Sequence, residues 1–172
     1  MKKLLIIIVI CLSQVNYAIA DVKISFVDLD KIIMTSKPGS SILKQLDEIN
    51  NQISKNLQDN EKILKNKETK IISQKNIIST EEFQSNITNL KIEINKYNLD
   101  RQKTINDFNK LKIDSTNKFF KEVNILLIKY SDKKSLSLIL PKKNVIVGKN
   151  EFDITDEIIK IVNNEIKEFK IK

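Results

Sequence analysis

The chain has 172 residues and a formal net charge of +8, and it contains no histidine, one cysteine, two glycines and two prolines. The absence of histidine removes the commonest general base, and a single cysteine cannot provide most zinc or copper ligand sets. Two glycines cannot build a phosphate-binding loop. The composition therefore predicts a protein that is not an enzyme and that uses no metal and no cofactor.

Residues 1–20 have the three parts of a secretory signal peptide. Met1-Lys2-Lys3 is followed by an apolar run from Leu4 to Leu12 and then by Ala18-Ile19-Ala20. We expect cleavage after Ala20, because the apolar run is shorter than the roughly 20 residues that a membrane anchor needs. The exported part then lacks cysteine and cannot be stabilised by disulfides, which is compatible with the bacterial periplasm.

Removing the two lysines of the signal lowers the net charge to 8 − 2 = +6. A basic surface favours anionic lipid headgroups, acidic proteins or nucleic acid, and export excludes nucleic acid as a partner. The alternative explanation is codon drift toward lysine, since Arg101 is the only arginine among the 30 basic residues.

Residues 21–39 are predicted to begin a small β body. From Val22 to about Asp28 apolar and polar residues alternate as in a half-buried strand, with Val22, Ile24 and Phe26 on one face. A short helical turn can follow, and the residues from Ser36 to Gly39 are interpreted as a break before the next element.

Residues 40–131 contain no glycine and no proline, which predicts two long helices. Ser79 and Glu82 have the spacing of a capping box, so the tip of a helical hairpin is placed near residue 79. At about 1.5 Å per residue the outgoing helix would be roughly 58 Å long and the returning one roughly 75 Å. The outgoing helix carries one apolar stripe, which we call the seam, at Ile42, Leu46, Ile49, Ile53, Leu57, Leu64, Ile71 and Ile78. Asn60, Lys67 and Gln74 interrupt the seam, which excludes a conventional tight coiled coil in the distal half of the helix.

Several apolar residues of this arm lie off the seam. Singly, each is explained by a wider helix interface, but as a set they predict an apolar wall that faces an open space: Ile63, Ile72, Ile77, Ile92, Leu99, Leu111 and Ile113. Lysines also gather near the tip, and they are predicted either to attract acidic partners or an anionic membrane surface, or to form a solvated helix face: Lys62, Lys65, Lys67, Lys70 and Lys75.

Residues 132–172 are predicted to complete the body. Leu136, Leu138 and Leu140 would share one face of a second strand, and a loop at 141–144 would lead into a third strand at 145–147 that forms a hairpin with the second. Asp153-Ile154-Thr155 would cap a last helix. Such a body is too small to stabilise itself, and its open strand edges favour pairing with other copies of the chain. The residues predicted to build the shared body are Val22, Ile24, Phe26, Leu136, Leu138, Leu140, Val145 and Val147.

The fold class is therefore α+β, with a small β body that is completed by oligomerisation and a long antiparallel helical hairpin inserted between its strands. In their order, the exported start, the strand Ile24 to Asp28 followed by Lys31-Ile32, the hairpin, the strand Leu136 to Leu140 and the closing Asp153-Ile154-Thr155 helix resemble the Skp (OmpH-like) periplasmic chaperones. The resemblance implies a homotrimer with a central barrel and three hairpins around a cavity. It also implies that unfolded outer-membrane proteins are held there without ATP, and it provides no catalytic residue.

An alternative of another class is a structural or adaptor protein of the cell envelope, in which the hairpin is a spacer between partners. Adaptors with such hairpins carry larger glycine-containing β-domains, which this chain lacks.

Overall fold

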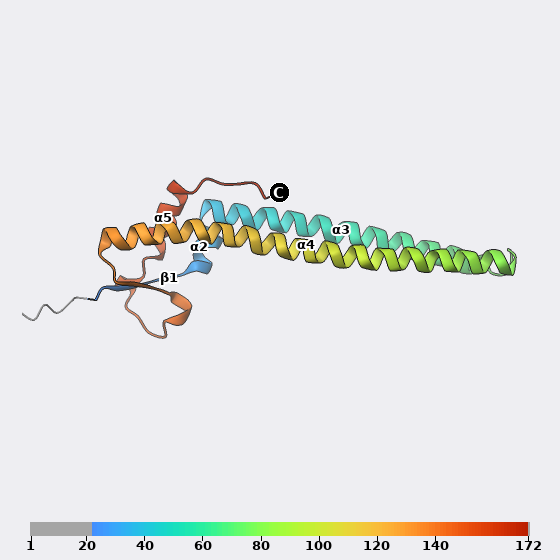
Figure 1. Ribbon diagram of the computed structural model, residues 1–172, viewed down its shortest axis with the longest axis horizontal. Coiled ribbons are helices and arrows are strands. Elements are labelled where there is room, and N and C mark those ends of the chain that lie inside the picture. Colours follow the sequence, from blue (N-terminus) through green and yellow to red (C-terminus); the bar gives the residue numbers. More distant parts are fainter. Residues whose placement is uncertain (1–21, 172) are drawn as a thin grey trace, which may run out of the picture.

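The computed structural model describes residues 22–171, and its dominant feature is a long helical hairpin that projects from a small body (Figure 1). The predicted signal peptide, residues 1–20, lies outside the described residues. The regular elements are β1 (Ile24–Val27), α2 (Leu29–Thr35), α3 (Lys37–Ser73), α4 (Thr80–Lys134), β2 (Leu138–Pro141) and α5 (Thr155–Glu165), with short 3-10 turns at Lys142–Asn144 and Asn150–Phe152.

The hairpin consists of α3 with 37 residues and α4 with 55 residues. At about 1.5 Å per residue, α3 extends about 55 Å and α4 about 80 Å. At the tip, the Ser79 hydroxyl oxygen accepts a hydrogen bond from the Glu82 N–H at 3.1 Å, which confirms the predicted cap at the start of the returning helix. None of the helices within residues 22–171 combines the length and the apolar character that crossing a membrane requires.

Helix α3 begins at Lys37, three residues earlier than the predicted start at Ser40. Ser36 caps it by accepting from the Gly39 N–H at 3.2 Å, and Pro38 is tolerated in the first turn because its missing N–H would have no helical partner there. Gly39 is required by packing, since a Cβ at this position would lie 2.3 Å from the Ile33 carbonyl oxygen. The residues interpreted as a break are therefore the first turn of the helix.

The body contains a two-stranded sheet in which β1 and β2 are parallel. The hairpin is the connection between them, and the register pairs Ile24 with Leu138 and Phe26 with Leu140. The other edge of β1 is occupied by the segment before α5, where the Ile154 N–H donates to the Phe26 carbonyl oxygen at 3.1 Å. The arrangement confirms the α+β class with an inserted hairpin.

The predicted third strand at 145–147 is wrong. After β2 the chain forms a 3-10 turn, and Ile146 and Val147 are almost fully exposed. Instead of returning along β2 as the second arm of a hairpin, this segment crosses the sheet beside Phe26, where a Cβ on Gly148 would lie 2.7 Å from Cε1 of the Phe26 ring. The second strand also begins later than predicted, because α4 continues to Lys134 and ends in a left-handed residue, Ser135.

The hydrophobic core lies where the base of the hairpin meets α2, α5 and the sheet. It is larger than the core expected from three strands and one helix, because the first turns of α3 and the last turns of α4 belong to it. Its buried members are Val27, Ile32, Ile33, Ile42, Leu46, Phe119, Val123, Leu126, Tyr130, Ile154, Ile158 and Val162. The body therefore anchors the hairpin rigidly at one end and leaves the distal arm without any such support.

Candidate functional site: the sheet face and the hairpin arm

The two faces of the sheet differ in what covers them. Val27 is buried in the core and Ile139 packs against it, so this face is covered by the helices. By the alternation of a strand, Ile24, Leu138 and Leu140 lie on the opposite face, where Ile24 and Leu138 are exposed.

Seven of the eight residues predicted to build a shared body gather around one hollow of about 730 Å³ beside this face. We call them the sheet face, and they are Val22, Ile24, Phe26, Leu136, Leu140, Val145 and Val147. The eighth, Leu138, lies instead along a separate groove with Leu127 and Ile128. An apolar hollow of this kind is therefore part of the surface of the single subunit.

The segment after β2 is fixed against the sheet face. A Cβ on Gly148 would lie 2.7 Å from Cε1 of Phe26, so a glycine is needed for this close approach. Lys142 Nζ and Asp153 Oδ2 form an ion pair at 2.7 Å. Burial alone would raise the pKa of the Asp153 carboxyl, but hydrogen bonds from Lys142 and Thr155 outweigh burial and hold that pKa below its usual value.

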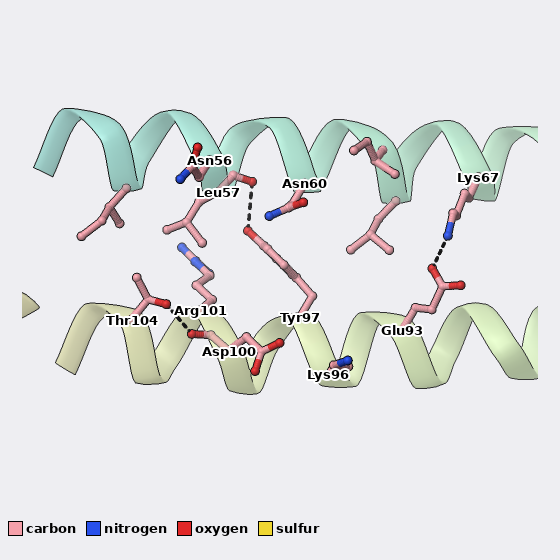
Figure 2. Close-up of a pocket in the computed structure, with 13 residues that line it drawn as sticks. Asn56, Leu57, Asn60, Lys67, Glu93, Lys96, Tyr97, Asp100, Arg101 and Thr104 are labelled. Carbon is pink, nitrogen blue, oxygen red and sulfur yellow. Dashed lines mark hydrogen bonds and ion pairs between the residues drawn. The ribbon is translucent and has the colours of Figure 1, made fainter. Parts of the chain in front are cut away.

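In the middle of the arm, the seam between α3 and α4 mixes polar and apolar side chains (Figure 2). The Tyr97 hydroxyl donates to Glu61 Oε1 at 2.8 Å and lies 3.3 Å from the Leu57 carbonyl oxygen. Burial and the neighbouring Glu61 raise the pKa of Tyr97. A groove of about 430 Å³ runs along this stretch, where Asn60 and Arg101 stand in place of apolar seam residues.

The five lysines predicted as a basic tip do not form one patch. Lys67 Nζ pairs with Glu93 Oε2 across the hairpin at 2.6 Å, so this lysine belongs to the seam (Figure 2). Lys62, Lys65, Lys70 and Lys75 are exposed, but positions 65 and 70 point about 140° apart around the helix. The lysines could be identified from the sequence, but the position of Glu93 opposite Lys67 could not.

Three residues of the predicted apolar wall form a stripe on the outer side of α4. Ile92, Leu99 and Ile113 are 61%, 73% and 58% exposed. Ile92 lies two positions after Leu90, which is buried beside α3, and a separation of two residues turns a side chain by about 200°. Leu99 lies 7 residues after Ile92, and Ile113 lies 14 residues after Leu99, so the three side chains share one face of α4. This apolar stripe is therefore on the side of α4 opposite the seam.

The other predicted wall residues lie elsewhere. Ile63 and Ile72 are exposed on α3, and Ile77 is exposed in the tip loop. Leu111 is not on a free surface, because it is half-buried and packs against the core at the base of the arm. Ile128 is 62% exposed and was missed, although its distance of 15 residues from Ile113 continues the same side of α4.

A small α+β body with parallel strands, from which a long helical hairpin projects, defines the class of this protein. A family model described as outer membrane protein (OmpH-like) matches residues 23–162. The chain belongs to this OmpH-like family, as the order of its elements predicted.

The fold is shared with a crystal structure from Caulobacter crescentus CB15 that is described as a candidate outer membrane chaperone (OmpH-like). The TM-score is 0.80 at 16% sequence identity, and the match covers 87% of this chain and 88% of that one. At this identity the likeness concerns the fold. Among curated proteins none matches the chain.

Proposed function

We propose that this protein is a periplasmic holdase chaperone, exported by cleavage after Ala20, that binds unfolded outer-membrane proteins without ATP and prevents their aggregation. Three copies would associate through the sheet face, and their hairpins would surround the space in which the client is held. Membership of the OmpH-like family supports the chaperone class.

The observation that carries the proposal is the apolar stripe of Ile92, Leu99 and Ile113 on α4. On a helix that packs through its opposite side, these positions are the most exposed and would ordinarily be polar. A holdase needs dispersed apolar contacts of this kind rather than one shaped pocket, because it must accept many sequences. The absence of a tight seam in the middle of the arm is compatible with a wall that adapts to its client.

The sheet face supports association of copies. Val22 and Ile24 are 61% and 42% exposed, and they border an apolar hollow formed by residues from both strands and the segment after β2. A contiguous apolar surface of this kind is characteristic of an interface. The open edge of β2 offers backbone groups to a neighbouring copy in addition.

The proposal is tested by suppression of aggregation. The chain of residues 21–172 is mixed with a urea-unfolded outer-membrane β-barrel protein at one trimer per client, and light scattering is followed after dilution. We expect the triple change Ile92→Gln, Leu99→Gln and Ile113→Gln to weaken suppression by about tenfold in the concentration required, since it removes three apolar contacts of roughly 0.5 kcal/mol or more each.

A matched control carries three amide-for-amide changes on the same helix: Asn95→Gln, Gln102→Asn and Asn109→Gln. This control should suppress aggregation as the wild type does. Full activity of the stripe variant would contradict the proposed site, and failure of the wild type would contradict the holdase function. Capture of one folded partner at fixed stoichiometry would instead favour the spacer alternative.

The attraction of the four exposed tip lysines to an anionic membrane surface stays a prediction. Cosedimentation with phosphatidylglycerol vesicles tests it, and binding should fall steeply between low and physiological salt if the lysines are responsible.

A further inference from the structure

The last described segment of the chain, residues 166–171, forms neither helix nor strand, yet it lies along the base of the hairpin (Figure 1). We call it the tail segment. Ile166, Phe169 and Ile171 are half-buried against the core, whereas the residues between them are exposed. The tail segment lies beyond residues 23–162, which match the family model, and no part of the proposed function uses it.

Gln45 on α3 binds the backbone of the tail segment. Its Nε2 donates to the Phe169 carbonyl oxygen at 3.1 Å, and its Oε1 accepts from the Ile171 N–H at 3.0 Å. A carbonyl and the N–H two residues later point to the same side of an extended chain, and they are the pair that one residue of a neighbouring parallel strand would bind. The side-chain amide therefore recognises extended backbone and reads no side chain.

The side chains of the tail segment are contacted by α4 and by the core. Lys118 on α4 places its Nζ 4.6 Å from the centre of the Phe169 ring, which is a cation–π contact. Ile171 packs against the core two residues later. We call the surface that Gln45, Lys118 and the core present to the tail segment the tail site, and it favours an aromatic residue followed, after one exposed residue, by an aliphatic one.

We propose that the tail site is a binding site for extended apolar peptide segments, and that residues 166–171 occupy it as a displaceable internal ligand. The tail segment is held by two hydrogen bonds to one side chain, by one cation–π contact and by three half-buried apolar residues. Segments with so few contacts are the first to open locally. Strands of outer-membrane barrels alternate apolar and polar residues in the same way, and their use of the tail site rests on the proposed function.

The experiment uses a fluorescein-labelled peptide of residues 165–171 and the chain of residues 21–172. The wild type should bind it weakly, because its own tail competes at a high effective concentration. The variant Phe169→Ala with Ile171→Ala weakens the internal ligand and should bind the peptide at least about tenfold more tightly. Absence of saturable binding to this variant would overturn the proposal.

Adding Gln45→Ala to that variant removes both backbone contacts and should reduce the affinity by about tenfold, the equivalent of two ordinary hydrogen bonds. Gln52→Ala is the matched control, since Gln52 is exposed on the same helix and its side chain donates to the neighbouring Asn56. Equal affinity with and without Gln45 would contradict recognition by the amide.

A second measurement does not depend on the peptide. In the wild type the Ile171 amide should exchange with deuterium at least about tenfold more slowly than in the Gln45→Ala variant, because the bond to Gln45 must open first. Unprotected exchange in the wild type would contradict occupation of the tail site. Peptide binding without suppression of aggregation would support the tail site and contradict the holdase function, so the two failures are distinguishable.

Discussion

Gly39 shows how one residue determines the junction between body and arm. A Cβ there would meet the Ile33 carbonyl oxygen at 2.3 Å, and this atom is backbone that cannot rotate away. Gly39→Ala should therefore destabilise the protein by about 2 kcal/mol, although in an unhindered helix the same change stabilises by about 1 kcal/mol. Urea unfolding of this variant beside Ser40→Ala, an exposed neighbour, measures the difference. A stabilised Gly39→Ala variant would contradict the close packing.

Tyr130 links the end of α4 to α5 through a hydrogen bond from its hydroxyl to Glu157 Oε2. Burial first, and then the hydrogen bond to Glu157 and its charge, raise the pKa of Tyr130 from 10.0 to about 12. Tyr130→Phe removes the donor and should cost about 1 kcal/mol at neutral pH.

The raised pKa also predicts a pH dependence. Between pH 10 and about 12 the unfolded chain has lost the phenol proton while the folded protein keeps it, so the stability due to this group is lost as the pH rises. The difference in unfolding free energy between wild type and Tyr130→Phe should shrink across this range. A constant difference up to pH 12 would show that the phenol is not perturbed.

At the scale of residues, the sequence predicts contacts between close neighbours in the chain and does not predict contacts between residues far apart in it. The Ser79 cap was predictable because Ser79 and Glu82 are three residues apart. The pairing of Lys67 with Glu93 was not, because the partners are 26 residues apart and meet only once the register of the hairpin is known. The binding of the tail segment by Gln45 has no sequence signal, since Gln45 and Phe169 are 124 positions apart and meet only in the folded chain.

At the scale of elements, the arm should be less stable in its middle than at its base. The base is packed by Ile42, Leu46 and Phe119, whereas the middle has a groove bordered by Asn60 and Arg101. Hydrogen exchange should be slow in α4 around Phe119 and faster around Tyr97. Asn60→Leu should fill part of the groove and slow exchange of the neighbouring amides by about fivefold, equivalent to roughly 1 kcal/mol.

Asp59→Asn is a suitable control for that variant, because Asp59 is exposed and does not border the groove. Uniform exchange along the whole of α4 would contradict a weak middle segment.

The helices were predicted better than the strands for a physical reason. Periodicity over 92 residues without glycine or proline specifies a helical hairpin by local preference alone. Strands of four residues depend on tertiary packing, and residues 145–147 do not return along β2 because their segment packs against the Phe26 ring at Gly148. The predicted break between Ser36 and Gly39 is wrong, because Gly39 is required for close packing against Ile33 and not for a turn.

At the scale of the whole molecule, the proposed function depends on association of copies through the sheet face. Ile24→Lys introduces a charge at a position that is 42% exposed in the subunit, so the change should alter subunit stability by about 0.5 kcal/mol or less. It should nevertheless dissociate the oligomer, because a lysine buried at the interface would be unpaired. Met34→Lys is the control, since Met34 is 65% exposed on α2 and lies outside the sheet face. This control should keep the oligomer.

The most direct test is the molar mass of residues 21–172 by light scattering during size-exclusion chromatography at micromolar concentration. We predict three times the mass of one chain for the wild type and for Met34→Lys, and the mass of one chain for Ile24→Lys. A wild-type protein that elutes with the mass of one chain would contradict the association of copies, and with it the enclosed space in which a client is held.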